Sequence, residues 1–335
     1  MLNSQWKDIV GHKELIGRLQ AMQMEERIPL AMLFCGAEGV GKTMVAEALA
    51  AALLCHEPDH GQCCGRCPAC LALKAGTHPD YFLLQPESSG KASKSIKIEA
   101  VRELQAGIAR VPLLSRCRAV IIQEAEKMNE AAANCLLKTI EEPEGQAVFI
   151  LLTSAPAALL DTIISRCMRV EFGILQIDEL QEVLCRQGLD RQEAQRLAAV
   201  ADGSAARAMA LREPEVRELH QKAFQLAERA GRLPVEEMLQ LAKDMSGYSR
   251  EQLIQWLGFL AMLYRDLLVL YSGGGLPLYN QPDVQKLSAL LARYPQHSLL
   301  ALLRLVQEYQ KRLRSNVNLQ LSLEGFLIKL EDLMQ

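Results

Sequence analysis

The chain has 335 residues, too many for one ordinary hydrophobic core, so we expect two or three domains. Half of the residues are apolar but only 5% are aromatic, a balance that favours helices over a β-sandwich. The formal net charge of −3 argues against a free-standing nucleic-acid-binding protein, which is usually basic overall.

The N-terminal residues lack a basic segment followed by an apolar core, so the sequence predicts no signal peptide. No run approaches 18 uninterrupted apolar residues, and the most apolar stretch is broken by Thr153, Ser154 and Pro156. These features predict a cytoplasmic protein. In a reducing compartment the ten cysteines should not form a disulfide framework, so a cluster of them is expected to bind metal.

Short apolar segments alternate with helical patterns over the first 170 residues. The expected strands are 31–36, 81–86, 119–122, 147–154 and 168–172. The expected helices are 42–55, most of 95–111 after a brief extended piece, and 129–142. Asn129 is the expected N-cap of the last of these, and Pro143 lies just past its end. Strands separated by helices predict a parallel sheet and an α/β fold.

Strand signals almost vanish after residue 172. The sequence predicts three short helices within 174–212 and long helices over 213–335. The sequence GGGLPLYNQP at 273–282 is the one evident loop in this second half.

A phosphate-binding loop is the clearest motif. The segment 36–43, GAEGVGKT, matches G-x-x-x-x-G-K-[ST] between a predicted strand and a predicted helix. The turn would cradle phosphate oxygens with backbone N–H groups. Lys42 would reach the β- and γ-phosphates, and the Thr43 hydroxyl would bind magnesium. The sequence therefore predicts bound ATP or ADP with Mg²⁺; the alternative is a glycine-rich turn without a ligand. The backbone positions expected in the cradle are Gly36, Gly39, Val40 and Gly41.

Hydrolysis requires more than this loop. A second strand should end in acidic residues that position magnesium and water. The best candidate is 119–122, which is followed by Gln123 and Glu124. Glu124 is expected at the nucleotide site, but glutamine at 123 makes efficient hydrolysis by this chain alone doubtful. Alternatively, Gln123 is only a polar strand end.

Five cysteines fall within sixteen residues. Four of them, Cys55, Cys64, Cys67 and Cys70, form the pattern C-x8-C-x2-C-x2-C, whose short gaps let four thiolates converge on one tetrahedral zinc ion. Cys63 is the main rival to Cys64; equal spacing favours Cys64. The alternative is a loop of reduced, metal-free cysteines. The remaining cysteines, at 35, 117, 135, 167 and 185, are expected to be packing residues.

In combination these motifs resemble bacterial clamp-loader subunits of the AAA+ class, and among them the delta-prime subunits of DNA polymerase III. The resemblance covers residues 4 to about 210 closely and the C-terminal end more loosely. It rests on the phosphate loop, the cysteine pattern and the stretches WKDIVGHKELIGRL, THPDYFLLQPE, AAANCLLKTIEEP, SRC and SNVNLQLSLEGFLIKL.

The resemblance implies a role for several residues. Val10 and Gly11 would border the adenine, Thr153 would take the sensor-1 position, and Arg207 would take the sensor-2 position. Arg166 would be an arginine finger that reaches the ATP of a neighbouring subunit, a task that suits the planar, permanently charged guanidinium. The alternative for Arg166 is a surface salt bridge.

The resemblance also implies an organisation and a function. Residues 1–172 would form an AAA+ nucleotide-binding domain with a zinc module at 55–70. Residues 173–212 would form a three-helix lid domain, and residues 213–335 a helical collar domain for oligomerisation. The implied partners are motor (gamma/tau) and delta subunits, with primed DNA and the sliding clamp reached through the complex.

The resemblance implies that a chain with Gln123 is a stationary subunit, which helps load the clamp and has little or no ATPase activity alone. Two alternatives remain. One is a gamma/tau-type motor subunit, and the other is an independent zinc-dependent nucleic-acid-binding module.

Overall fold

The computed structural model describes residues 5–87, 95–141, 146–273, 278, 284–315 and 317–334. The chain divides into two compact units, residues 1–183 and 184–335. Each unit is described separately below. The predicted division at 172 and 212 into three domains stays a prediction.

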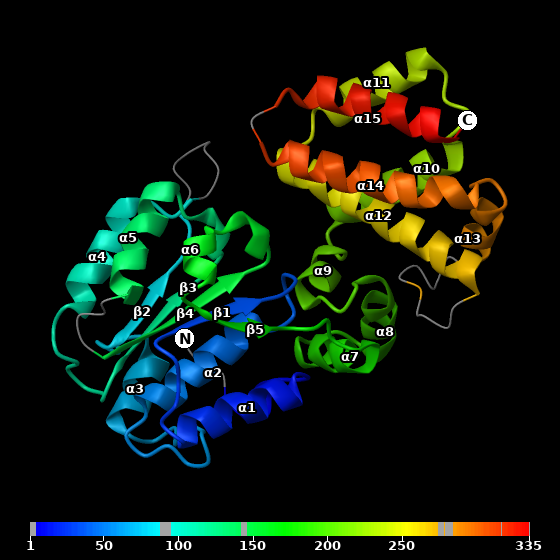
Figure 1. Cartoon of the computed structure of the whole chain (residues 1–335). Helices are drawn as coiled ribbons and strands as arrows, with labels where there is room; N and C mark the ends of the chain where they lie inside the picture. Colours follow the sequence, from blue (N-terminus) through cyan, green and yellow to red (C-terminus); the bar gives the residue numbers. More distant parts are fainter. Residues whose placement is uncertain are drawn as a thin grey trace. The chain divides into compact units, whose positions relative to one another are not determined.

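The first unit is built on a five-stranded parallel sheet (Figure 1). The order of the strands across the sheet is β2-β3-β4-β1-β5, which places β5 at one edge and β1 inside. The strands are β1 (Ala31–Cys35), β2 (Tyr81–Leu84), β3 (Arg118–Ile122), β4 (Ala147–Thr153) and β5 (Met168–Glu171).

Helices cover both faces of this sheet, which explains why its central strands are continuous apolar runs. Alternate side chains of one strand face opposite layers: Met32 and Phe34 join one core cluster, while Leu33 joins the other. The first layer includes α1 (Lys13–Met24) and α2 (Lys42–Leu54). The opposite layer includes α4 (Ile98–Ile108), α5 (Glu130–Glu141) and α6 (Asp161–Ile164), as Figure 1 shows.

Every strand predicted from the sequence is present within two residues of its predicted ends. The helices at α2, α4 and α5 are also confirmed. Asn129 caps α5 through its Oδ1, which accepts a hydrogen bond from the backbone N–H of Ala132 at 2.8 Å. Pro143 lies outside the described residues. The elements that the sequence did not predict are α1, α6, α3 (Pro68–Ala75) and the single-turn helices η1 (Trp6–Asp8), η2 (Ala125–Lys127) and η3 (Pro156–Ala158).

Three short helices follow the sheet, as the sequence predicted for 174–212. They are α7 (Ile177–Arg186), α8 (Arg191–Val200) and α9 (Ala205–Ala210). The longer helices after them are α10 (Pro214–Arg229), α11 (Val235–Met245), α12 (Arg250–Ser272), α13 (Val284–Leu291), α14 (Gln296–Leu313) and α15 (Leu319–Met334). The predicted loop at 273–282 lies almost wholly outside the described residues.

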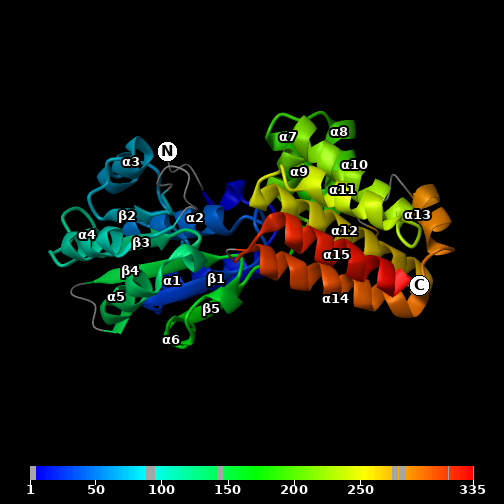
Figure 2. The ribbon, with the colours of Figure 1, turned by 90° about the horizontal axis from the view of Figure 1, so that it is seen from above.

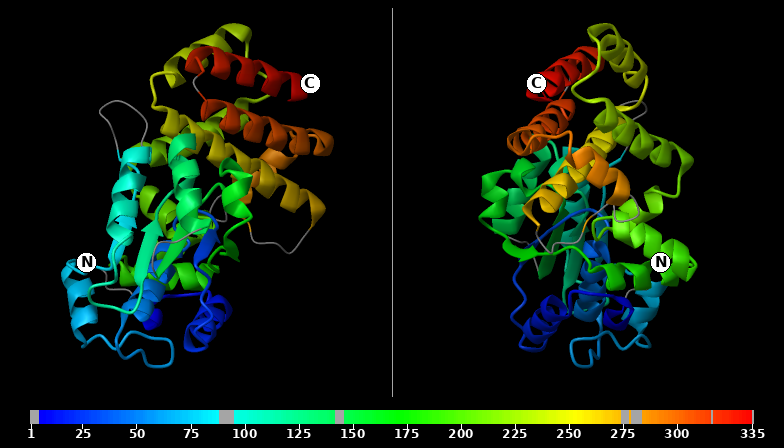
Figure 3. Two further views of the ribbon diagram at one scale, coloured as in Figure 1. Left: turned by 60° about the vertical axis from the view of Figure 1, so that its left-hand side comes forward. Right: turned by 90° about the vertical axis from the view of Figure 1, so that its right-hand side faces the viewer.

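The second unit packs around α12 and α14 (Figures 2 and 3). Within it, α10 and α13 contact α12, while α15 contacts both α11 and α14. The ring of Phe326 meets Trp256 and Tyr309 edge to face, with centroids 5.9 Å and 5.4 Å apart. The nearly buried carboxylate of Glu331 accepts a hydrogen bond from the backbone N–H of Gly231 at 3.0 Å, which ties α15 to the turn before α11.

Helix α12 is long and apolar enough to cross a membrane by length and composition alone. In this structure it is a core helix: 61% of its most apolar window is buried within the protein. The packing of Leu253, Trp256 and Leu260 explains its hydropathy without a membrane.

Candidate functional site

The phosphate loop joins the end of β1 to the start of α2, as predicted. Gly39 and Gly41 have positive φ angles of 75° and 106°, which a residue with a side chain rarely adopts. At Gly36 a Cβ atom would lie 2.7 Å from the carbonyl oxygen of Phe172. Glycine is therefore required by the turn at 39 and 41, and by close backbone approach at 36.

Lys42 is the first residue of α2 and folds back over the loop. Its Nζ donates hydrogen bonds to the carbonyl oxygens of Gly36 at 2.7 Å and Ala37 at 2.6 Å. Burial lowers the pKa of Lys42, while the charges of Glu126 and Glu38 act in the opposite direction. The ammonium thus lies inside the loop, at the N-terminus of a helix, where phosphate groups are favoured.

The N-terminal segment packs against this loop. His12 donates from Nε2 to the carbonyl oxygen of Val40 at 2.8 Å, and its ring meets Phe172 edge to face at 5.1 Å. Gly11 is buried with a φ of 78°, and a Cβ there would lie 2.7 Å from the side chain of Leu175. The loop contact is made by His12, while Gly11 lies against Leu175; the predicted adenine contacts of Val10 and Gly11 stay a prediction.

The end of β3 lies two strands away from β1 in the sheet. The backbone N–H of Gln123 donates to Leu84 at 2.8 Å, which continues the pairing with β2. Glu124 follows with a φ of 48°, and its half-exposed carboxylate forms an ion pair with Lys127. Glu124, the one acidic residue predicted at the nucleotide site, thus forms its ion pair with Lys127 of the same turn.

Thr153 ends β4 directly beside the start of the phosphate loop. It is buried and pairs in register with Cys35, and its carbonyl oxygen accepts a hydrogen bond from the N–H of Gly36 at 3.3 Å. Its Oγ1 accepts from the N–H of Ala155 at 3.1 Å. Its predicted sensor-1 role stays a prediction. Thr43 is half-buried on the first turn of α2, next to Lys42.

Arg166 lies between α6 and β5 and its side chain is 40% exposed. Its Nε forms an ion pair with Glu141 of α5, and Nη1 donates to the carbonyl oxygen of Thr162 at 3.1 Å. The salt bridge considered as an alternative from the sequence is therefore present. Half-exposed ion pairs of this kind are worth only about 0–1 kcal/mol, so releasing the guanidinium costs little.

Arg207 belongs to the second unit, on α9. Its Nη1 lies 3.2 Å from the carboxylate of Asp202 and 3.1 Å from the sulfur of Met262. The side chain of Arg207 is 37% exposed. Its predicted sensor-2 role stays a prediction.

The cysteine cluster forms as predicted. The Sγ atoms of Cys55, Cys64, Cys67 and Cys70 all lie within 4.8 Å of one another. The Cys55–Cys67 and Cys64–Cys70 sulfur pairs are each separated by 3.9 Å. Four sulfurs at about 2.3 Å from a tetrahedral ion would lie about 3.8 Å apart, so this group of cysteines can hold a metal ion. Cys63 is not a member of the group.

Backbone groups already favour thiolate at this cluster. The N–H groups of Cys64, Cys67 and Cys70 donate to the sulfur of the preceding cysteine of the group at 3.3–3.4 Å. A hydrogen bond from the backbone of Arg66 is the main factor that lowers the pKa of Cys64 to about 6. Burial instead raises the pKa values of Cys55 and Cys70. A cation would supply the charge needed to ionise the buried pair.

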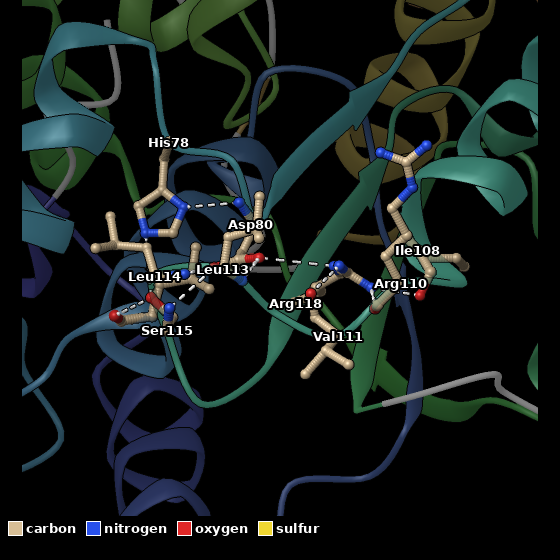
Figure 4. A network of polar contacts seen from close by, with 10 residues as sticks. His78, Asp80, Ile108, Arg110, Val111, Leu113, Leu114, Ser115 and Arg118 are labelled. Atoms are coloured by element: carbon tan, nitrogen blue, oxygen red, sulfur yellow. Dashed lines mark hydrogen bonds and ion pairs between the residues drawn. The ribbon is translucent and has the colours of Figure 1, made fainter.

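A buried ionic network surrounds Asp80 (Figure 4). Asp80 is fully buried and accepts hydrogen bonds from the backbone N–H groups of Leu113, Leu114 and Ser115 at 2.7–2.9 Å. Its carboxylate also lies 3.6 Å from the guanidinium of Arg118, which is only 3% exposed.

The loop held by Asp80 reaches the metal-binding insert. The Oγ of Ser115 donates to the carbonyl oxygen of Leu54 at 2.7 Å, next to Cys55. His56 donates to the carbonyl oxygen of Leu114 at 2.8 Å. From the other side, Trp6 donates from Nε1 to the carbonyl oxygen of Gly61 at 2.7 Å. The insert is thus an integral part of the first unit.

Comparison with known proteins gives the family. The family described as "DNA polymerase III, delta subunit" matches residues 11–176, and its C-terminal counterpart matches residues 217–332. A DNA polymerase III subunit delta′ of Bacillus subtilis is 30% identical over 330 residues, which cover 98% of each chain. This chain belongs to the DNA polymerase III delta′ family.

Other delta′ and related subunits match parts of the chain. A delta′ subunit of Pseudomonas aeruginosa is 45% identical over 139 residues, 42% of each chain. A tau/gamma subunit of Haemophilus influenzae is 33% identical over 174 residues, which cover 52% of this chain but only 24% of that protein. The predicted parallel α/β fold with a phosphate loop and a helical C-terminal half is confirmed for this delta′ family member.

Among solved structures, a gamma subunit-related protein of Thermotoga maritima is similar over 95% of this chain and 99% of its own. The identity is 18% and the TM-score is 0.40. A likeness this low carries no information about the function of the delta′ family member.

Three features were not predicted from the sequence. They are the hydrogen bond of His12 to Val40 at the phosphate loop, the Asp80–Arg118 network beside the cysteine insert, and the position of Glu126. The Oε1 of Glu126 accepts hydrogen bonds from Ser154, from Oγ at 2.8 Å and from the backbone N–H at 3.2 Å. Glu126 follows Glu124 by two residues, and this proximity to the strand end is the only signal the sequence offered.

Proposed function

We propose that this chain is a clamp-loader subunit of the replicative DNA polymerase III holoenzyme, which helps ATP-driven loading of the sliding clamp onto primed DNA. Its partners would be motor (tau/gamma) and delta subunits, as the names of its relatives suggest, and it would work in the cytoplasm. We further propose that it binds ATP or ADP with Mg²⁺ at its own phosphate loop and contributes Arg166 to catalysis in a neighbouring motor subunit.

One observation carries this proposal: a complete phosphate loop follows β1, while the neutral Gln123 follows β3 of the same sheet. The positive φ angles of Gly39 and Gly41 and the Lys42 ammonium folded over the loop support nucleotide binding there. The neutral Gln123 at the end of β3 disfavours rapid hydrolysis.

A gamma/tau-type motor remains the rival within the same assembly. It requires efficient hydrolysis by this chain, whereas our proposal requires very little. ATP turnover by the purified chain separates them: rates comparable to a motor subunit would support the rival. An independent nucleic-acid-binding module is disfavoured because hydrogen bonds from His56 to Leu114 and from Trp6 to Gly61 tie the cysteine insert to the rest of the first unit.

We expect Lys42→Ala to abolish nucleotide binding while changing the clamp-loading rate of an assembled complex little. The ammonium is the charge in the loop that the phosphates need, but Gln123 already limits hydrolysis at this site. Nucleotide affinity by titration and loading rate on primed DNA are the two measurements. Lys13→Ala, on the neighbouring and exposed start of α1, is the control. A large loss of loading by the Lys42 variant, with assembly intact, would identify the site as a working motor.

We propose zinc as the metal of the cysteine cluster, because four thiolates in a closed tetrahedral group are a structural zinc site. Elemental analysis should give about one zinc per chain. A Cys64→Ser/Cys67→Ser double variant should lose it. Cys63→Ser, at a neighbouring cysteine outside the group, should keep it. Stoichiometric zinc in the double variant, or its loss from Cys63→Ser, would contradict the assignment.

A further inference from the structure

One carboxylate oxygen of Glu126 accepts hydrogen bonds, and the other accepts none from the residues that the structure describes. Oε1 accepts both hydrogen bonds from Ser154, whereas Oε2 is buried and accepts no hydrogen bond from any residue the structure describes. A buried carboxylate oxygen without a donor costs free energy. Such an atom is a place where a ligand group or its ion is expected.

The contacts of Ser154 place Glu126 beside the phosphate loop. Ser154 directly follows Thr153, whose carbonyl oxygen accepts the hydrogen bond of Gly36 at 3.3 Å. Lys42 in turn donates to the carbonyl oxygen of Gly36. The negative charge of Glu126 also acts on Lys42, where it opposes the fall in pKa caused by burial. Geometry and charge thus connect Glu126 to the loop lysine.

Neither of the two residues directly after β3 offers a free carboxylate to the nucleotide site. Gln123 is neutral, and the carboxylate of Glu124 forms an ion pair with Lys127 on a half-exposed turn. Among these three side chains, Glu126 alone combines a negative charge with a buried oxygen that lacks a donor.

We propose that Glu126 is the carboxylate of the nucleotide site and acts toward the magnesium ion of a bound nucleotide in place of an acidic residue at 123. This inference rests on the proposed nucleotide binding. Ser154 fixes Oε1, so Oε2 is held in one orientation. Carboxylate oxygen is the ligand type that Mg²⁺ prefers, directly or through its waters. Without magnesium the same charge repels a triphosphate.

The test compares ATP affinity with and without magnesium, measured by calorimetric titration of the full-length chain. Magnesium is left out of the buffer rather than removed with a chelator, because a chelator would also take metal from the cysteine cluster. For the wild-type chain we expect tighter binding with magnesium. Glu126→Gln keeps an acceptor for Ser154 but removes the charge, so the gain in affinity from magnesium should fall about tenfold, as for other groups that support a bound metal. Binding in magnesium-free buffer should be unchanged or tighter.

Glu130→Gln, four residues further on and exposed, is the matched control and should leave the magnesium gain unchanged. Equal thermal stability of the variants shows that the fold is intact. An unchanged gain in Glu126→Gln, or a fall confined to Glu124→Gln, would overturn the assignment of Glu126. No ATP binding by the wild-type chain would overturn the proposed nucleotide site as well, so the two failures are distinguishable.

Discussion

Arg166→Ala should slow ATP hydrolysis by the adjacent motor subunit in an assembled complex by about 10³–10⁵, the contribution of an arginine finger in related phosphoryl-transfer enzymes. The guanidinium is half-exposed and its ion pair with Glu141 is weak, so turning it toward a neighbour's phosphates would cost little free energy. The measurement is single-turnover hydrolysis in the complex, together with the clamp-loading rate.

Two variants separate this role from a structural salt bridge. Arg166→Lys should rescue little, because a point charge does not reproduce the planar fork. Arg169→Ala removes an exposed arginine of β5, paired with Glu171, and should leave hydrolysis unchanged. Unaltered hydrolysis and loading in the Arg166→Ala complex would return Arg166 to the role of a surface ion-pair partner.

Asp80→Asn should lower the free energy of unfolding of the first unit by about 3–5 kcal/mol, the cost of breaking a buried ion pair. The amide cannot replace a carboxylate that accepts three backbone N–H groups, and it leaves Arg118 buried without its anion. Urea unfolding followed by Trp6 fluorescence measures this loss. A Trp256→Phe background leaves Trp6 as the sole tryptophan.

The loss of unfolding free energy caused by Asp80→Asn should depend on pH. Burial alone would raise the pKa of Asp80, but the N–H donors outweigh it and lower the pKa. The stabilisation is therefore present above the unfolded value of about 3.9 and disappears as pH falls through the lower folded value. The gap between the wild-type chain and Asp80→Asn should begin to close below about pH 4 and should disappear only below the lowered folded-state pKa of Asp80. Asp59→Asn, at an exposed position, should differ little from wild type. A gap between wild type and Asp80→Asn that persists unchanged at low pH would refute the ionic explanation.

Much of the fold follows from local pattern. Apolar runs bounded by polar residues predicted all five strands, and the phosphate loop and cysteine spacing each lie within a short segment whose geometry its own residues fix. Short elements escaped prediction because one turn, such as α6, contains too few residues to show a period.

Pairings across long separations could not be predicted. Asp80 and Arg118 look like ordinary charged residues at strand ends, and only the β2–β3 pairing buries them together. Glu126 meets Ser154 because β3 and β4 are neighbours in the sheet. Arg166 likewise meets Glu141 only when α6 packs beside α5. In each case the charged residue is visible in the sequence, but its partner depends on which elements are neighbours in the fold.

Assembly tests the central claim most directly. The chain is mixed with tau/gamma and delta subunits of its own organism, and the native mass of the product is measured. We expect a single hetero-oligomer that contains this chain, forms without ATP hydrolysis at its own phosphate loop, and persists in the Lys42→Ala variant. A chain that stays separate from both partners at micromolar concentration would contradict the account.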